Sequence, residues 1–343
     1  MPNDGPLVSV IVPNYNYGAS LALCLRAIQE QTYQPLEIVL VDDCSTDDSV
    51  AVAAGLGIRA VSTGVNSGVA VARNLGAEHA AGELLVFVDS DVALAPDAVS
   101  NAVAVLRNDP SLGAVCGVYE PHPLIRDSLV EEYRSLQQYY LLIESEGPLS
   151  TVHTSHFTTP AAVFRDLGGF NPQLRHTEDQ DFGLRLVQRY GSVSVSTVRG
   201  THDHDDTMAV VVRKAYARTR LAIPLYLKRR SMPGGFVTGP RTFATVLSLA
   251  TVAAVLLPVL LGALWTVAPV LLLAAALACD AGLYRCAARH KGWSFVPYFA
   301  AVNFVVNLTV AAGIITGGAR CLVSSRFREL YTSALAPARR VDA

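Results

Sequence analysis

Two carboxylates separated by one residue, Asp89 and Asp91, directly follow an uninterrupted apolar run at residues 84–88 (LLVFV). A run of this length and composition is typical of a buried central strand. Open α/β sheets bind ligands at the carboxyl ends of their strands. Mg²⁺ and Mn²⁺ prefer oxygen ligands and bind carboxylates together with substrate phosphates. The spacing therefore favours a metal–diphosphate site, although many D-x-D pairs only form turns or helix caps.

Two more polar clusters follow predicted strands upstream. The first strand, 8–12 (VSVIV), leads into an aromatic, amide-rich loop at 13–17, and the strand 37–41 (EIVLV) ends at Asp42. Parallel strands end at one edge of a sheet, so we expect these clusters and the two carboxylates to border one crevice. Asp42 and Asp43 can also be plain capping or turn residues, and Asp47 and Asp48 are interpreted as such.

The elements that must position these residues alternate along the chain. Helices are predicted over residues 19–30, 68–81 and 96–107, and further strands over 59–62 and 114–118. Strands that alternate with helices form βαβ units with a mostly parallel sheet. The predicted fold class is therefore α/β and Rossmann-like.

A third set of candidate residues lies downstream, where a helix predicted over 179–188 follows the turn 168–172 (GGFNP). Glu178 and Asp179 open this helix, and acidic residues in a first turn are ordinary helix-dipole partners. His202 begins the run HDHDD, which is either a polar loop or a source of one further metal ligand. A zinc hydrolase site is unsupported, because the chain has no H-E-x-x-H spacing.

Together these features resemble the family 2 glycosyltransferases, which have a GT-A fold. The resemblance covers roughly residues 7–213 and rests on five ordered segments: VSVIVPNYN, EIVLVDDCSTDDS, GVAVARNLGAEHAAGELLVFVDSD, FRDLGGF and HTEDQDFGLRL. It implies transfer of a sugar from a nucleotide-diphospho-sugar with inversion at the anomeric carbon. One departure is Cys44, which stands where the family usually has Gly or Asn.

The resemblance also implies roles for individual residues. Asp91 would hold Mn²⁺ or Mg²⁺ with help from Asp89 and His202, and the metal would stabilise the departing diphosphate. Asp179 would be the base that takes the acceptor's proton, with Glu178 beside it in the acceptor site. The residues expected to bind the donor nucleotide are Pro13, Tyr15, Asn16, Asp42, Asp43, Arg73, Asp89 and Ser90.

The composition predicts a membrane-bound protein. The 343 residues are 51% hydrophobic and 16% charged, against about 25% charged in an average soluble domain. Residues 242–279 and 293–319 contain no charged side chain, and each stretch exceeds the roughly 20 residues that span a bilayer. Three spans are predicted, near 243–261, 266–284 and 294–318. We expect an integral protein of the plasma membrane with a cytoplasmic catalytic domain.

Three spans would leave the basic C-terminal tail outside the cell, against the positive-inside rule. A fourth crossing, a re-entrant segment or an exception to the rule would each resolve this conflict. The expected regions are the glycosyltransferase domain at 1–206, a basic interfacial segment at 207–241, membrane helices at 242–319 and the tail at 320–343.

The basic interfacial segment has eight Lys or Arg residues and no acid. Such a stretch favours an anionic membrane surface on the cytoplasmic side. Arg213 and Lys214 are candidate contacts for the donor diphosphate or for a lipid phosphate. The six scattered cysteines indicate reduced thiols, and the net charge of −2 gives no sign of a nucleic-acid partner. The expected partners are the sugar donor, a lipid-linked or glycan acceptor, and membrane lipids.

Three other functions deserve comparison. A sugar nucleotidyltransferase could use the same sheet edge and metal, but such enzymes more often have a Gly-rich basic loop near the N-terminus, and none occurs here. A non-catalytic membrane scaffold could retain the fold, although intact Asp91 and Asp179 argue against it. A processive synthase usually has a Q-x-x-R-W motif, which is missing between residues 199 and 241.

Overall fold

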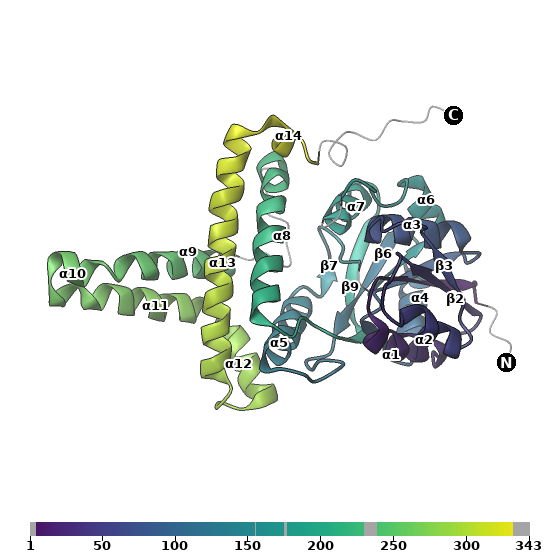
Figure 1. Ribbon diagram of the computed structural model, residues 1–343, viewed down its shortest axis with the longest axis horizontal. Helices are drawn as coiled ribbons and strands as arrows, with labels where there is room; N and C mark the ends of the chain where they lie inside the picture. The colour runs from purple at the N-terminus through teal and green to yellow at the C-terminus, as the bar shows by residue number, and fades with distance from the viewer. Residues whose placement is uncertain (1–4, 155, 175–176, 230–238, 332–343) are drawn as a thin grey trace. The chain divides into compact units, whose positions relative to one another are not determined.

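The computed structural model describes residues 5–154, 156–174, 177–229 and 239–331 and divides into two units (Figure 1). The first unit comprises Met1–Arg126, Leu141–His204 and Tyr331–Ala343, and the second comprises Asp127–Tyr140 and Asp205–Leu330. Parts of two predicted regions, residues 230–238 of the basic segment and 332–343 of the tail, lie outside the described residues.

The first half of the sheet is parallel, as predicted. Its strands pair in the order β3, β2, β1, β4, and each pair is parallel. The strands are β1 (Val8–Asn14), β2 (Leu36–Asp42), β3 (Ala60–Ser62) and β4 (Leu84–Val88). The helices between them are α1 (Gly18–Gln29), α2 (Ser49–Gly55) and α3 (Val69–His79). Asn14 lies opposite Asp42 in the register, so the ends of β1 and β2 meet at one edge.

The second half of the sheet is mixed. β4 pairs antiparallel with β8 (His156–Pro160), which pairs antiparallel with β6 (Leu112–Tyr119). β9 (Gly191–His202) runs parallel to β6, while β5 (Val92–Leu94) and β7 (Gly147–Pro148) pair antiparallel with β9. The helices in this half are α4 (Ala98–Asn108), α6 (Ala161–Asp166) and α7 (Glu178–Val187). The prediction of a mostly parallel sheet thus describes the half formed by β3, β2, β1 and β4 best.

A cluster of buried phenylalanines joins the second half of the sheet to its helices. Phe87 of β4 stacks on Phe157 of β8, with ring centroids 5.0 Å apart. Phe170 packs on Phe182 of α7 at 4.8 Å and meets Phe87 edge-on at 5.5 Å. Aromatic pairs of this kind contribute about 0.5–1.5 kcal/mol beyond their buried area. The cluster therefore fixes the end of β4, the loop around residue 170 and α7 relative to one another.

The second unit is helical. Its elements are the first part of α5 (Leu129–Glu144), α8 (Met208–Arg229), α9 (Gly239–Ala254), α10 (Leu257–Leu261), a 3₁₀ helix (Ala263–Thr266), α11 (Val267–Cys279), α12 (Ala281–Lys291), α13 (Val296–Val323) and α14 (Ser325–Arg328). Within the described ranges, α13 is the one single helix whose length and composition would allow it to cross a membrane. Residues 263–279 and 281–291 would make a second candidate, bent by 66°. The predicted span 243–261 is broken between α9 and α10.

Candidate active site

The edge where β1 and β2 end is built around the carboxylate of Asp42. Asn14 donates a hydrogen bond to Asp42 Oδ1 at 3.1 Å, and the backbone N–H of Ser45 donates to Oδ2 at 3.0 Å. Asp42 is buried, so these donors offset much of the cost of burying its charge. The carboxylate is thereby held in a fixed orientation at the sheet edge.

The backbone at Cys44 has the conformation that favours the Gly or Asn expected at this position. Cys44 has a φ of +64°, a left-handed conformation that Gly and Asn adopt more readily than other residues. Asn16 also has a left-handed φ, of +60°, and its side chain accepts hydrogen bonds from the Thr46 and Asp47 amides. Asn16 therefore ties the two loops together. Of the residues expected to bind the donor nucleotide, Pro13 is buried and Tyr15 is 44% exposed.

Asp43 positions the helix that follows rather than facing outward. Its Oδ1 accepts from the Ser67 amide and the Thr63 hydroxyl, each at 2.8 Å, and its Oδ2 accepts from the Gly68 amide at 2.8 Å. Gly68 is the residue immediately before α3. The carboxylate thus fixes the start of the helix that carries Arg73.

Arg73 connects two of the predicted motifs. Its Nη2 donates to Asp89 Oδ1 at 2.7 Å, its Nη1 donates to Glu178 Oε1 at 2.9 Å, and the guanidinium lies over the Phe170 ring at 5.4 Å. Burial by itself would lower the pKa of Arg73, but the charges of Asp89 and Glu178 outweigh it and raise the pKa. Arg73 stays charged and joins the end of β4 to the first residue of α7.

Asp91 and His202 meet through a pairing of two distant segments. Val92 lies opposite His202 in the β5–β9 register, which brings His202 Nε2 to 3.8 Å from Asp91 Oδ1. Asp91 and Ser90 are buried, whereas the Asp89 side chain is 27% exposed. Two predicted metal ligands, Asp91 and His202, are therefore close to each other at this strand end, and Asp89 and Ser90 directly precede Asp91 in the chain.

Asp91 and His202 supply part of the ligand set that Mn²⁺ or Mg²⁺ needs. The Asp91 carboxylate oxygen and the His202 imidazole nitrogen lie 3.8 Å apart, so both can bind one ion between them. Carboxylate is the ligand type that these ions prefer. No group of three or more His, Cys, Asp or Glu side chains with metal-site geometry occurs among the described residues. Asp91 and His202 would hold the ion together with substrate phosphates, while Asp89 is partly committed to Arg73.

Asp179 lies in the first turn of α7, one residue after Glu178, and is half-buried. Its Oδ1 accepts a hydrogen bond from the Gln180 amide at 2.7 Å. Glu178 is buried and bound to Arg73. The two acidic residues thus have different surroundings, and Asp179 is the more accessible of the pair.

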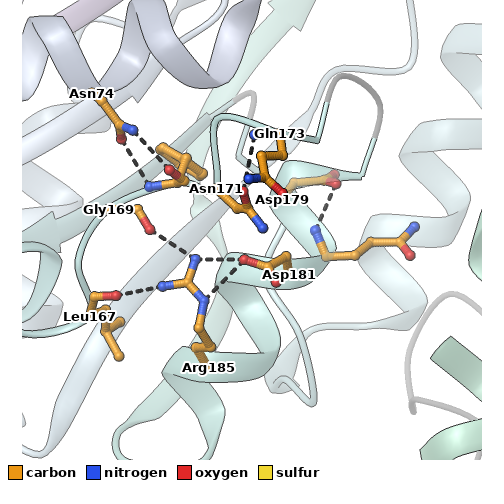
Figure 2. A network of polar contacts seen from close by, with 10 residues as sticks. Asn74, Leu167, Gly169, Asn171, Gln173, Asp179, Asp181 and Arg185 are labelled. Carbon is orange, nitrogen blue, oxygen red and sulfur yellow. Dashed lines mark hydrogen bonds and ion pairs between the residues drawn. The ribbon is translucent and has the colours of Figure 1, made fainter. Parts of the chain in front are cut away.

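The loop before α7 is clamped from two sides (Figure 2). Asn74 of α3 donates to the Phe170 carbonyl at 2.8 Å and accepts from the Phe170 amide at 2.9 Å. Arg185 of α7 bonds Asp181 and donates to the carbonyls of Leu167 and Gly169. The same loop borders an open cavity of about 410 Å³. The backbone at this position is therefore fixed beside a solvent-accessible hollow.

Arg213 and Lys214 belong to α8 of the second unit, and their role in phosphate binding stays a prediction. Arg213 is exposed, and Lys214 forms an ion pair with Asp205.

The structure also identifies contributors that the sequence did not single out. They are Asn14 beside Asp42, Phe170 beneath Arg73, Asn74 on the loop, and Tyr119, whose ring meets the His202 ring edge-on at 4.9 Å. Asn14 and Asn74 are each adjacent in the chain to a predicted site residue, and this adjacency could have identified them. No local pattern could have identified Tyr119, because the β6–β9 pairing that brings it to His202 is long-range.

Comparisons with known proteins place the first half of the chain close to glycosyltransferases. Residues 9–163, a little under half of the chain, match the family model described as glycosyl transferase family 2. A relative from Haemophilus influenzae named "Uncharacterized glycosyltransferase" is 27% identical over 188 residues, which cover 53% of this chain and 62% of the relative. The O-antigen chain rhamnosyltransferase RfbN of Salmonella typhimurium is 28% identical over 216 residues, 57% of this chain and 67% of that protein.

A solved structure shares the fold. The mannosyltransferase PcManGT from Pyrobaculum calidifontis, in complex with GDP-Man and Mn²⁺, is 24% identical with a TM-score of 0.53, covering 96% of this chain and 84% of that one. The likeness shows a GT-A-like fold. The chain spans about six tenths of the length of the Haemophilus relative.

Proposed function

We propose that this chain, which carries a family 2 glycosyltransferase domain at residues 9–163, is a membrane-anchored, metal-dependent inverting glycosyltransferase. It moves a sugar from a nucleotide-diphospho-sugar to a lipid-linked or glycan acceptor at the cytoplasmic face. The observation that carries this proposal is the double contact of Arg73 with Asp89 and Glu178, which couples the strand end of the donor site to the helix of the candidate base.

The donor nucleotide binds along the edge formed by β1, β2 and β4. The exposed Tyr15 ring offers a stacking surface, and the oriented carboxylate of Asp42 accepts from a base N–H. Asn16 and Asp43 support this edge by fixing the loops and the start of α3.

The diphosphate lies at the end of β4, beside Asp91 and His202. A divalent ion bound there would neutralise charge on the departing diphosphate. Arg73 holds Asp89 in place and keeps one permanent positive charge close to it.

Asp179 accepts the proton of the attacking acceptor hydroxyl. Its place in the first turn of α7 leaves it half-buried, while the neighbouring Glu178 is committed to Arg73. A base of this kind contributes roughly 10²–10⁴-fold to the rate. We assign Glu178 a positioning role and Asp179 the proton transfer.

Attachment to a membrane favours an acceptor that resides there, such as a polyprenyl-linked sugar or a glycolipid. The uncharged stretches of the second unit and its basic α8 support this attachment. Arg213 and Lys214 remain candidate phosphate contacts.

The proposal can be tested with the purified full chain, a panel of nucleotide sugars, Mn²⁺ and a lipid extract as acceptor. Release of nucleoside diphosphate together with a glycosylated product identified by mass spectrometry is the expected result. Release of pyrophosphate would instead indicate a nucleotidyltransferase, and neither turnover nor donor binding would indicate a scaffold. The substitution Asp179→Asn provides the matched catalytic control.

A further inference from the structure

The most apolar part of the second unit is a helical hairpin formed by α9, α10, the 3₁₀ helix and α11, residues 239–279, which we call the apolar hairpin. Figure 1 shows α9 and α11 side by side, joined at α10 and running across α13 rather than along it. Between Arg241 and Asp280 it contains no charged residue. The apolar side chains at its tip are strongly exposed, with Val259 at 83% and Leu264 at 86%. Such a continuous apolar surface requires an apolar medium.

Three hydroxyl groups of α9 are satisfied within the helix itself. Thr245, Ser248 and Thr251 each donate a hydrogen bond to the carbonyl four residues earlier, at 3.1, 2.7 and 2.7 Å. Elements inside a bilayer must satisfy their polar groups in this way, because no water is available there. At about 1.5 Å per residue, α9 and α10 together reach about the 30 Å thickness of the hydrocarbon core.

Charged and polar residues gather at the open end of the apolar hairpin. Arg241 lies in the first turn of α9, with its guanidinium 5.5 Å from the centre of the Tyr140 ring. Asp280 directly follows α11 and accepts hydrogen bonds from Asn303 at 2.8 Å and Asn307 at 3.3 Å. This cluster marks a boundary between a polar base and an apolar tip.

The helix α13 has a different environment, because it packs along α8. A Cβ added to Gly313 would lie 2.9 Å from Thr219 Cβ, and one added to Gly317 would lie 2.7 Å from Ile223 Cγ1. The two helices therefore run side by side in the same direction at very short range (Figure 1). If this part of α13 lay in the hydrocarbon core of a bilayer, the part of α8 beside it would lie there too.

That stretch of α8 is strongly basic. Arg213, Lys214, Arg218 and Arg220 lie within eight residues, and Arg213 and Arg218 are exposed. A charged side chain at the centre of a bilayer costs about 2.5–3.5 kcal/mol on insertion scales. Asp205 can offset the charge of Lys214 but leaves the arginines. These costs oppose a membrane crossing by α13, despite its length and apolar composition.

We propose that the apolar hairpin crosses the bilayer, and that α8 and α13 lie along the membrane surface on the side of its open end. The basic residues of α8 then meet anionic headgroups, and the exposed Ile314, Ile315, Leu322 and Val323 of α13 meet the acyl boundary. Two crossings leave both ends of α13 and the basic segment after it on the cytoplasmic side, which satisfies the positive-inside rule. The inference rests on the membrane attachment in the proposed function and not on sugar transfer.

The test uses three single substitutions in the full chain, each at an exposed residue: Ala263→Cys at the tip, and Ser294→Cys and Ser325→Cys near the two ends of α13. Spheroplasts are treated with a membrane-impermeant maleimide before and after lysis, and the wild-type chain measures labelling of the six native cysteines. The expected result is labelling of Ala263→Cys in intact spheroplasts, and of Ser294→Cys and Ser325→Cys after lysis alone.

Three outcomes would overturn the inference. Labelling that differs between Ser294→Cys and Ser325→Cys would mean that α13 crosses the membrane. Protection of Ala263→Cys until lysis would mean that the apolar hairpin does not cross. If alkaline carbonate released the wild-type chain from the membrane, this result would disprove the membrane attachment itself. Nucleoside diphosphate release, measured on the same chain, reports separately whether it transfers sugar.

Discussion

The guanidinium of Arg73 lies 2.9 Å from the carboxylate of Glu178, although the two residues are 105 positions apart. Both are buried, and the same guanidinium reaches Asp89 at 2.7 Å. Two carboxylates on separate elements would repel each other without the arginine between them. Arg73 of α3 therefore adds an ionic link between α7 and the end of β4 to the packing of the phenylalanine cluster.

Glu178→Gln tests this ionic link. The amide keeps an acceptor oxygen but loses the charge, so we expect the free energy of unfolding to fall by about 1–3 kcal/mol. We also expect transfer to slow and the donor KM to rise, because Arg73 is less well held near Asp89. Urea unfolding and steady-state kinetics on the purified chain measure both effects.

The matched control is Glu78→Gln, which removes the same charge from an exposed position on α3. It should leave both measurements within experimental error. Equal behaviour of the two variants would contradict the positioning role of Glu178.

Asp179→Asn separates donor binding from chemistry. The amide has nearly the same size as the carboxylate but cannot take a proton, so the transfer rate should drop by roughly 10²–10⁴-fold. Donor affinity, measured by calorimetry with a non-transferable donor analogue, should stay close to that of the wild type. Normal turnover by this variant would disprove the assignment of the base.

Asp91→Ala removes the carboxylate that lies 3.8 Å from His202. Because hard cations bind through carboxylate oxygen, the variant should lose the increase in donor affinity that Mn²⁺ gives the wild type. We expect transfer to fall by about 10²–10³-fold, as when electrostatic stabilisation of a leaving group is lost. Donor titrations with Mn²⁺ and with a chelator provide the comparison, and an unchanged response to Mn²⁺ would exclude Asp91 as a ligand.

Part of this fold was predictable from local sequence. The strand β4 is found at the predicted residues, because its apolar run is bounded on both sides by acidic residues. The parallel strands β1 and β2 were predicted within two residues of each end, because Pro13 follows the first apolar run, Pro35 precedes the second and Asp42 follows it.

In the second half of the sheet, β6 was predicted at residues 114–118, inside its observed range, but β8 and β9 were not predicted. β8 reads HFTTP, and its buried polar residues hide the strand pattern; Thr159 is accommodated by donating to the Gly113 carbonyl at 2.7 Å. β9 is likewise rich in small polar residues. The proximity of Asp91 and His202 depends on the β5–β9 pairing, which no local pattern encodes. Sequence reasoning could therefore name both residues but not the contact between them.

Asn74→Ala tests the clamp on the loop before α7. The substitution removes both hydrogen bonds to Phe170 and leaves a half-buried amide and carbonyl without these partners, so the unfolding free energy should fall by about 1–3 kcal/mol. Hydrogen exchange should accelerate locally at residues 168–173. The exposed Asn108→Ala is the control, and identical exchange in the two variants would show that the loop is held by other contacts.

The buried histidines give the first unit a dependence on pH. Burial lowers the pKa of His156 to about 3, with a further contribution from His153, whose own pKa is lowered by burial. The unfolded chain takes up a proton on His156 as the pH falls through about 6.5, while the folded chain stays neutral until about pH 3. The stabilisation is therefore complete above pH 6.5 and is lost as the pH falls, by up to about 1.4 kcal/mol per pH unit for each such group.

Urea midpoints from pulse proteolysis at pH 7.5 and 5.5 measure this loss, and the lower pH should give the lower midpoint. His156→Gln removes one of the titrating groups, so the difference between the two midpoints should shrink even if the variant is less stable overall. His79→Gln, at an exposed position on α3, should keep the full difference. If His156→Gln kept it as well, the pH dependence would have to come from other groups, because the proton taken up on unfolding would not be that of His156.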